Sequence, residues 1–398
     1  MKFKLIITYA LIFLVAGCAD TQSSETSEAL QDYYELEENI EEIGNILSNQ
    51  DIVILGESTH WSEDITKEKV DLIDYLAEEH GFNKLFLETP DSEFNYYRDS
   101  GLDMKDGVME QYHQNIFAEY LNEENSNITA LPMDWSPLIE NNNASHISLL
   151  EENITDEINR YDTELAEEFK RSEYALRDWF AKGLFLNQRV DNLERPTDVY
   201  QDIRNEKFFE KLPEPSQDYI ISRHEDIKNY YSQINFDNAL IEYYDYREIG
   251  MADKVLSKME QDDKAIVWVA NGHSNYDVTK IDNTHEVFEI ERKDERNESL
   301  GALLRDSQYS VYNVGIYYNE ADDYGLIPHE VATPRKTEDD TLAGYIGNKV
   351  SDDIFIDFQT SEFVEEKAYT AFNAGSYDYQ MVPQEQFDGL IYIDHLEK

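Results

Sequence analysis

Cysteine is almost absent from this chain, which has one, Cys18, among 398 residues. An internal disulfide needs two cysteines and a zinc-thiolate site needs several, so the sequence excludes both. Because Cys18 belongs to the N-terminal signal described below, no cysteine is left to act as a nucleophile.

Basic residues are scarce as well. The 33 lysines and arginines face 85 aspartates and glutamates, which gives a formal net charge of −52. Nucleic-acid binding needs a cationic surface, so this balance argues against DNA or RNA as a partner. A strongly acidic surface stays soluble by self-repulsion and is most stable where salt screens its charges, so we predict adaptation to high salt.

A long apolar run occurs at the N-terminus. Two lysines precede the apolar residues 5–15, and the segment ends in Val15-Ala16-Gly17-Cys18. This order is typical of a bacterial lipoprotein signal. We therefore predict a signal peptide at residues 1–17, a lipid on Cys18, and a protein held by that anchor on the extracytoplasmic face of the cell membrane.

The remainder of the chain has the composition of a tethered, folded domain. Residues 18–35 are rich in Ser, Thr, Glu and Gln, which predicts a flexible tether. A content of 41% hydrophobic and 13% aromatic residues is enough to bury a large core. Because no internal repeat or Pro/Gly-rich linker divides it, we predict one domain over residues 36–398.

Apolar runs bounded by polar residues predict strands that are buried on both faces, as in a parallel sheet. Between the first two runs lies a helical pattern that Ser62 begins and Gly81 ends. Residues from about 146 to 260 are helical in pattern. The prediction is an α/β fold, in which helices flank a central, mostly parallel sheet and the middle segment forms a large helical insertion. The expected strands are Ile52–Leu55, Leu85–Leu87, Ile128–Met133, Lys264–Val269, Tyr309–Tyr317 and Leu390–Ile393.

Polar and titratable side chains follow four of these strands. Ligands of open α/β sheets bind at the carboxyl edge of the strands, where chain-distant loops meet. A lone buried carboxylate costs several kcal/mol or gives up its charge, so acids at this edge need partners. We expect one site there. Its candidate residues are Glu57 and His60, then Glu88, then Asp134, then Asn271 and His273.

His60 is the candidate base. Glu57 can accept one imidazole proton and fix the tautomer, so that the other ring nitrogen takes a proton from water. Glu88 can do the same from the neighbouring strand, or either acid can pair with a structural lysine or arginine. Arg247 and Lys69 can balance these acids or bind an anionic intermediate. For Lys69, we favour an exposed charge on its helix over a role in the site.

Several short motifs together carry a family resemblance. They are Gly56-Glu57-Ser58-Thr59-His60, His80-Gly81-Phe82 leading into Phe86-Leu87-Glu88, Asp134, Arg247 with Met251-Ala252, Trp268-Val269-Ala270-Asn271-Gly272-His273, and Ser299-Leu300-Gly301. In this order and spacing they resemble the erythromycin esterase-like family over most of residues 50 to 320.

The resemblance implies an α/β fold with a deep cleft, and hydrolytic opening of macrolide lactones by a metal-independent general base, with no cofactor and no nucleophilic serine. A role in the response to antibiotics follows from such chemistry. His60 matches the base, Glu57 and Glu88 match the acids that orient base and water, and His273 matches the second histidine of a His-Asn-x-His segment. The first histidine of that segment is Ala270 here, and Lys69 stands where an arginine is usual.

Three hypotheses follow. The first is a lipid-anchored hydrolase of a small-molecule ester or lactone, in which His273 or Arg247 steadies the oxyanion and Lys69, Asn271 and Asp134 contribute to substrate binding. The second is a surface lipoprotein that binds a metal or haem iron with the same Glu/His cluster. The third is a non-catalytic homologue, which the alanine at position 270 favours.

Overall fold

The structure is a computed structural model that describes residues 32–60, 62–102, 127–136, 149–179, 196–234, 239–283, 298–321, 335–338, 340–373 and 377–397. Cys18 and the expected signal peptide lie outside these residues. Tyr34 and Glu35, at the end of the expected tether, form a short strand that pairs with Phe355 and Ile354. No helix in the described ranges is long and apolar enough to cross a membrane.

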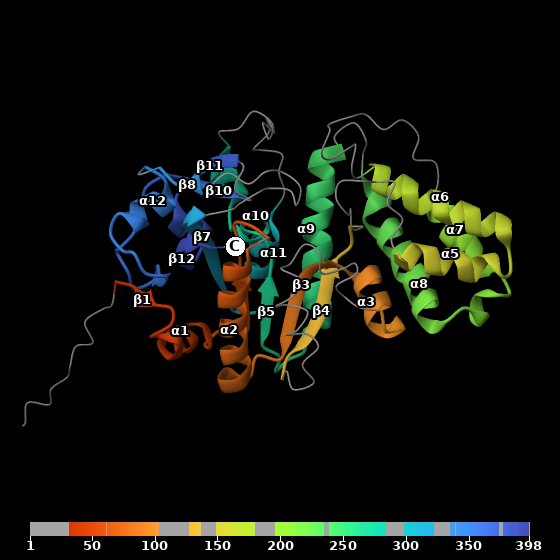
Figure 1. Ribbon diagram of the computed structural model, residues 1–398, viewed down its shortest axis with the longest axis horizontal. Helices are drawn as coiled ribbons and strands as arrows, with labels where there is room; N and C mark the ends of the chain where they lie inside the picture. Colours follow the sequence, from red (N-terminus) through yellow and green to blue (C-terminus); the bar gives the residue numbers. More distant parts are fainter. Residues whose placement is uncertain are drawn as a thin grey trace, which may run out of the picture.

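Strands and helices alternate through much of the chain (Figure 1). The strands are β1 (Tyr34–Glu35), β2 (Ile52–Leu55), β3 (Lys84–Pro90), β4 (Thr129–Asp134), β5 (Ala265–Trp268), β6 (Asp282–Asn283), β7 (Val311–Ala321), β8 (Arg335–Lys336), β9 (Ile354–Asp357), β10 (Tyr369–Asn373), β11 (Tyr377–Met381) and β12 (Gly389–Leu396). The helices are α1 (Ile40–Leu47), α2 (Glu63–His80), α3 (Asp91–Ser100), α5 (Leu149–Asn159), α6 (Thr163–Trp179), α7 (Pro196–Asn205), α8 (Glu214–Asn229), α9 (Ala239–Lys258), α10 (Asn271–Ser274), α11 (Leu300–Arg305), α12 (Leu342–Gly347) and α13 (Pro383–Gln386).

The main sheet has the order β1-β9-β12-β7-β2-β5-β3-β4, with β8 paired to β7. The pairs from β12 through β7, β2, β5 and β3 to β4 are parallel, and the pairs made by β1, β9 and β8 are antiparallel. A smaller antiparallel sheet has the order β10-β11-β6. The predicted α/β class with a mostly parallel central sheet flanked by helices is therefore confirmed.

Alternation along the central strands divides the core between the two faces of the sheet. Val53 and Leu55 pack in one cluster with residues of α1 and α2, such as Ile43 and Leu72. Ile52 and Ile54 point the other way and pack in a second cluster with residues of α9 and α11. Because successive side chains of a strand point to opposite faces, a residue that follows one of these strands lies on the α2 side or on the α9 side of the sheet.

Helix α2 begins and ends as the sequence predicts. The Ser62 hydroxyl accepts a hydrogen bond from the Ile65 backbone N–H at 3.2 Å, and Gly81 adopts the left-handed conformation with φ of 73°. A hydroxyl at the N-cap satisfies one of the unpaired N–H groups of the first turn, and glycine adopts positive φ without strain. The N-terminus of α2 is therefore fixed close to the end of β2.

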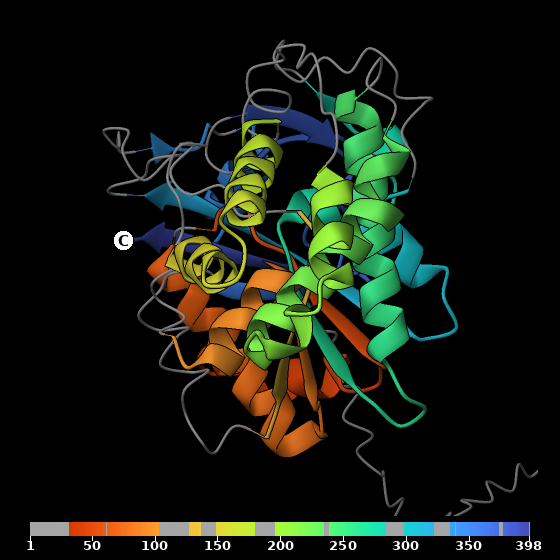
Figure 2. The same cartoon turned by 90° about the vertical axis from the view of Figure 1, so that its right-hand side faces the viewer.

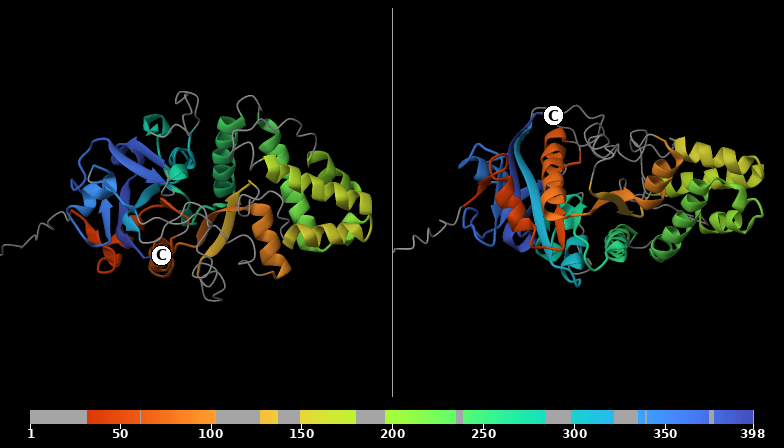
Figure 3. Two further views of the ribbon diagram at one scale, coloured as in Figure 1. Left: turned by 45° about the horizontal axis from the view of Figure 1, so that its top comes forward. Right: turned by 90° about the horizontal axis from the view of Figure 1, so that it is seen from below.

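The helical insertion lies at one end of the molecule. Helices α5 to α8 pack together beyond α3, and α9 returns along the edge of the sheet beside β4 (Figures 1 and 2). Seen from below, the insertion and the sheet occupy opposite ends of the long axis (Figure 3). Helix α9 thus connects the insertion to the strand edge that carries the polar residues.

Candidate active site

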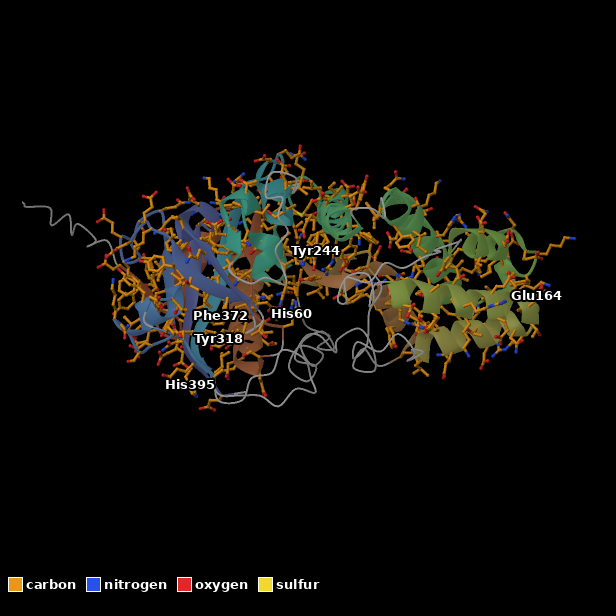
Figure 4. The ribbon with its side chains drawn as sticks, turned by 90° about the horizontal axis from the view of Figure 1, so that it is seen from above. His60, Glu164, Tyr244, Tyr318, Phe372 and His395 are labelled. Atoms are coloured by element: carbon orange, nitrogen blue, oxygen red, sulfur yellow. The ribbon has the colours of Figure 1, made fainter. Side chains whose placement is uncertain are left out.

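The candidate residues meet where β2, β5 and β3 end. Leu55 lies beside Trp268, and Trp268 lies beside Leu87, so the three parallel strands end at one level. Strand β5 separates β2 from β3, so the expectation that Glu88 comes from the strand next to that of His60 is wrong. Figure 4 shows His60 and Tyr244 in the middle of the molecule, with the C-terminal strands toward one end and helices α5 to α8 at the other.

Glu57 organises the half of the site that faces α2. Its Oε1 lies 2.6 Å from His60 Nδ1, and its Oε2 accepts hydrogen bonds of 2.7 Å each from Lys69 Nζ and the Trp268 indole N–H. The backbone carbonyl of Glu57 accepts from the Asn271 N–H at 2.7 Å. Glu57 is 2% exposed, so these partners replace the water that a buried carboxylate loses.

His60 is the most exposed member of this half, with 21% of its side chain accessible. Burial favours the neutral ring and lowers its pKa, but the hydrogen bond to Glu57 and the charge of Glu88 outweigh burial, so the pKa is raised above 6.5. The Nδ1 proton points to Glu57, which leaves the lone pair of the neutral ring on Nε2. This is the geometry of an oriented general base.

Lys69 is fully buried, so the prediction of an exposed helix charge is wrong. Its Nζ lies between Glu57 Oε2 and the face of the Trp268 ring, 4.2 Å from the ring centroid. Burial lowers the pKa of Lys69 to about 8, although the charge of Glu57 favours the ammonium form. Lys69 therefore balances an acid of the site.

Arg247 organises the half of the site that faces α9. Its Nη2 donates to Glu88 Oε1 at 2.7 Å and to Asp134 Oδ2 at 2.7 Å, and its Nε donates to Asp134 at 3.0 Å. The second oxygen of Glu88 accepts from the Ala270 N–H at 3.0 Å. Both acids are buried, which favours their neutral forms, but Arg247 and, for Glu88, His273 hold their pKa values below the ordinary range.

His273 lies between two acids. Its Nδ1 contacts Glu248, and its Nε2 lies 3.2 Å from Glu88 Oε1. Burial alone would lower the pKa of His273, but the charges of Glu248 and Glu88 raise it to about 10. The two carboxylates therefore favour the protonated ring, which makes His60 and not His273 the better candidate for the base.

Asn271 does not line the site with its side chain. The amide donates to the Ile316 carbonyl at 2.9 Å and accepts from the Ile316 N–H at 3.2 Å, which ties the end of β5 to β7. The Asn271 amide therefore has a structural role in place of the substrate contact that we expected. The predicted acids and bases at positions 57, 60, 69, 88, 134, 247 and 273 are brought together.

Sequence reasoning missed Glu248 and Trp268. Glu248 follows Arg247 directly on α9 and accepts from the Leu300 N–H at 2.8 Å as well as contacting His273. Its signal was a second charged residue beside Arg247 on an aromatic-rich helix. Trp268 begins one of the motifs that carry the family resemblance, but nothing in the sequence indicates that its indole N–H donates to Glu57.

Two further observations concern the chemistry of the site. In the described part of the chain, no group of three or more His, Cys, Asp or Glu side chains has an arrangement suited to a metal ion. The oxygens of Glu57 and Glu88 accept instead from Lys69, Arg247 and backbone N–H groups.

The hydroxyl of Ser58 is buried without a hydrogen-bond partner among the described residues, so no described base is placed to activate it.

The fold and site define an α/β protein with a compact set of paired acids and cations at the carboxyl edge of a parallel sheet. Residues 145–396 match the sequence model of the erythromycin esterase family, and the chain belongs to that family. It is 23% identical over 390 residues to a Bacillus subtilis (strain 168) protein named "Putative hydrolase YbfO", covering 88% of this chain and 85% of that protein.

Solved structures share the fold. A Bacillus cereus protein matches with a TM-score of 0.59 and 16% identity over 92% of this chain and 94% of its own. A mutant of erythromycin esterase EreC in its open conformation matches with a TM-score of 0.57 and 14% identity, over 90% of this chain and 94% of its own. A succinoglycan biosynthesis protein matches with a TM-score of 0.58 and 16% identity, over 90% and 91%.

Proposed function

We propose that this protein is a hydrolase that opens an ester or lactone bond with water activated by His60. Membership of the erythromycin esterase family and the similarity to a protein named as a hydrolase support the hydrolase class. The observation that carries the proposal is the 2.6 Å contact of His60 Nδ1 with Glu57 at the end of a parallel strand. This contact fixes the tautomer that general-base catalysis requires.

In the first step, Nε2 of neutral His60 takes a proton from water as the oxygen attacks the substrate carbonyl. Glu57 stabilises the imidazolium that forms, and it is held in place by Lys69 and Trp268. Collapse of the tetrahedral intermediate breaks the bond to the alcohol oxygen, which takes the proton back from His60. The products are a carboxylic acid and an alcohol, joined in one molecule when the substrate is a lactone.

The oxyanion of the intermediate is assigned to Arg247. Its Nη1 lies 3.3 Å from His273 Nε2, and a doubly protonated His273 cannot accept a hydrogen bond there. The Nη1 hydrogens are therefore the donors that the guanidinium can turn to a substrate oxygen, while Nε and Nη2 hold Asp134 and Glu88.

A panel of macrolides and simple aryl esters, assayed with and without chelator, tests the function. Hydrolysis of a panel member that chelator does not reduce is expected, and resistance to the macrolides it opens would follow. Inhibition by chelator would instead favour metal-assisted hydrolysis. A purified, folded protein that leaves the whole panel intact would contradict the ester or lactone specificity.

The pH dependence of kcat/KM should be a narrow bell. The active form needs neutral His60, so activity should rise about tenfold per pH unit up to its pKa, which lies above 6.5. Lys69, with a pKa of about 8, loses the charge that holds Glu57 as pH rises further, so activity should fall on that side. A pH series with a confirmed substrate measures both limbs.

The control for the alkaline limb is Lys69→Arg. Arginine keeps its charge throughout the accessible pH range, so the fall near pH 8 should disappear while the acidic limb stays. An unchanged alkaline limb in this variant would show that another group causes it.

We also propose that the protein is anchored to the membrane by a lipid on Cys18. The support is the apolar run and small residues before that cysteine. In Cys18→Ser expressed from the full gene, the protein should move from the detergent phase to the aqueous phase of a detergent-partition assay, because no acyl chain can be attached. Equal partition of both proteins would contradict the anchor.

A further inference from the structure

The two carboxylates around His273 favour its doubly protonated form. One ring nitrogen contacts Glu248 and the other lies 3.2 Å from Glu88. A neutral imidazole has one N–H, so one of the two carboxylates would face a nitrogen lone pair. Both carboxylates can accept from the ring only when it carries two protons and a positive charge. With one proton, on Nδ1, the Nε2 lone pair would face Glu88 Oε1 at 3.2 Å, and its one donor would be Arg247 Nη1 at 3.3 Å.

Both carboxylates are held beside the ring by further hydrogen bonds. Glu248 lies on α9, is 8% exposed, and has its second oxygen held by the Leu300 N–H at 2.8 Å. Glu88 is held by the Ala270 N–H and by Arg247. The charged groups around the ring are therefore Glu248, Glu88 and Arg247, two anions and one cation.

We propose that Glu248 is a positioning residue that keeps His273 as a doubly protonated cation, and that this cation anchors Glu88 within the site. Glu248 contacts His273 and a backbone N–H, so it acts through the ring and not on substrate. The two histidines then have different roles: His60 exchanges a proton with water, and His273 remains protonated on both ring nitrogens. The raised pKa of His273, about 10, agrees with this assignment. The catalytic consequence rests on the proposed function, whereas the protonation state does not.

Glu248→Gln tests the proposal. The glutamine amide has one acceptor oxygen, but both His273 Nδ1–H and the Leu300 N–H need one, and the negative charge is gone. The pKa of His273 should fall from about 10 to near or below 6.5, as read from ¹⁵N chemical shifts of the ring nitrogens in the full chain. If the variant is active, its kcat should fall about 10- to 100-fold with a smaller change in KM, as for other residues that orient site groups.

Two comparison variants separate positioning from general stability. Glu248→Asp keeps the charge and should restore much of the raised pKa. Glu385→Gln removes an acid of similar size that pairs with the exposed Lys280, and it should leave the His273 signals and the rate unchanged.

The outcomes are distinguishable from those of the proposed function. A wild-type His273 that titrates near 6.5 would overturn the inference whatever the activity, and the same holds if the ring stays doubly protonated up to about pH 9 in a folded Glu248→Gln variant. If that variant does not fold, the wild-type titration and the Glu248→Asp variant decide. A doubly protonated His273 in a protein that hydrolyses no ester would leave this inference standing and the hydrolase proposal refuted.

Discussion

His60→Asn is expected to slow hydrolysis about 100- to 10,000-fold, the contribution typical of a positioned general base. Asparagine can still donate to Glu57 Oε1, but it has no nitrogen that accepts a proton near neutral pH. The loss should appear in kcat, because the proton moves in the chemical step and not on binding. Steady-state kinetics on a confirmed ester or lactone measures it.

The fold of this variant should be preserved. Glu57 keeps Lys69 and Trp268 as partners, so no buried charge is left uncompensated. The matched control is His395→Asn, whose ring is 39% exposed beside Glu320 and far along the chain from the site residues. It should hydrolyse at the wild-type rate. An unchanged rate in His60→Asn, with folding verified by circular dichroism, would refute the assigned role.

Ser58→Ala separates this mechanism from a serine nucleophile. If Ser58 attacked the substrate, its removal would be as damaging as that of His60. Because its hydroxyl has no described partner, we expect the alanine variant to keep the rate of hydrolysis within a few-fold.

Much of the site could be predicted from the positions at which the apolar runs of the sequence end. The runs before Glu57, Glu88, Asp134 and His273 all form parallel strands, and parallel strands bring their carboxyl ends to one edge. The sequence therefore predicts which segments meet. It does not give the order of the strands, because the position of β5 between β2 and β3 depends on contacts made more than 170 residues apart along the chain.

The sequence also did not indicate which cation each acid of the site pairs with, because the acids lie on opposite faces of the sheet. Odd-numbered residues of β2 and β3, such as Val53, lie in the cluster with α2, and even-numbered ones, such as Phe86, lie in the cluster with α9. Glu57 therefore meets Lys69 on α2, whereas Glu88 meets Arg247 on α9. Lys69 lies on the apolar stripe of α2, four residues after Ile65 and three before Leu72, but a lysine there is expected to be exposed unless an acid offsets its desolvation. That acid, Glu57, lies 12 residues earlier, outside the helix.

Arg247→Met is expected to lower the free energy of unfolding by about 3–5 kcal/mol at neutral pH, the usual cost of breaking a buried ion pair from one side. Asp134 is almost inaccessible and would lose its cation, whereas Glu88, which is also buried, would keep His273. Methionine fills most of the volume, so the loss reports charge more than packing. The control is Arg98→Met, which breaks an exposed pair with Asp99 and should change stability by less than about 0.5 kcal/mol.

The difference in free energy of unfolding between the wild type and Arg247→Met should depend on pH, and this dependence identifies its cause. In the wild type, Arg247 holds the pKa of Asp134 below 3.8, and His273 and Arg247 together hold the pKa of Glu88 below 4.5, so this stabilisation is present above those values and is lost as pH falls through the depressed ones. In the variant, burial raises the pKa of Asp134, whereas His273 still holds the pKa of Glu88 down, so the folded protein takes up a proton at Asp134 as pH falls from 7. The gap in urea midpoint between wild type and variant should therefore narrow from pH 7 to about pH 4. A gap that stays constant with pH would mean that Arg247 stabilises the fold by packing and that the hydrogen bonds from Ser136 keep Asp134 charged without it.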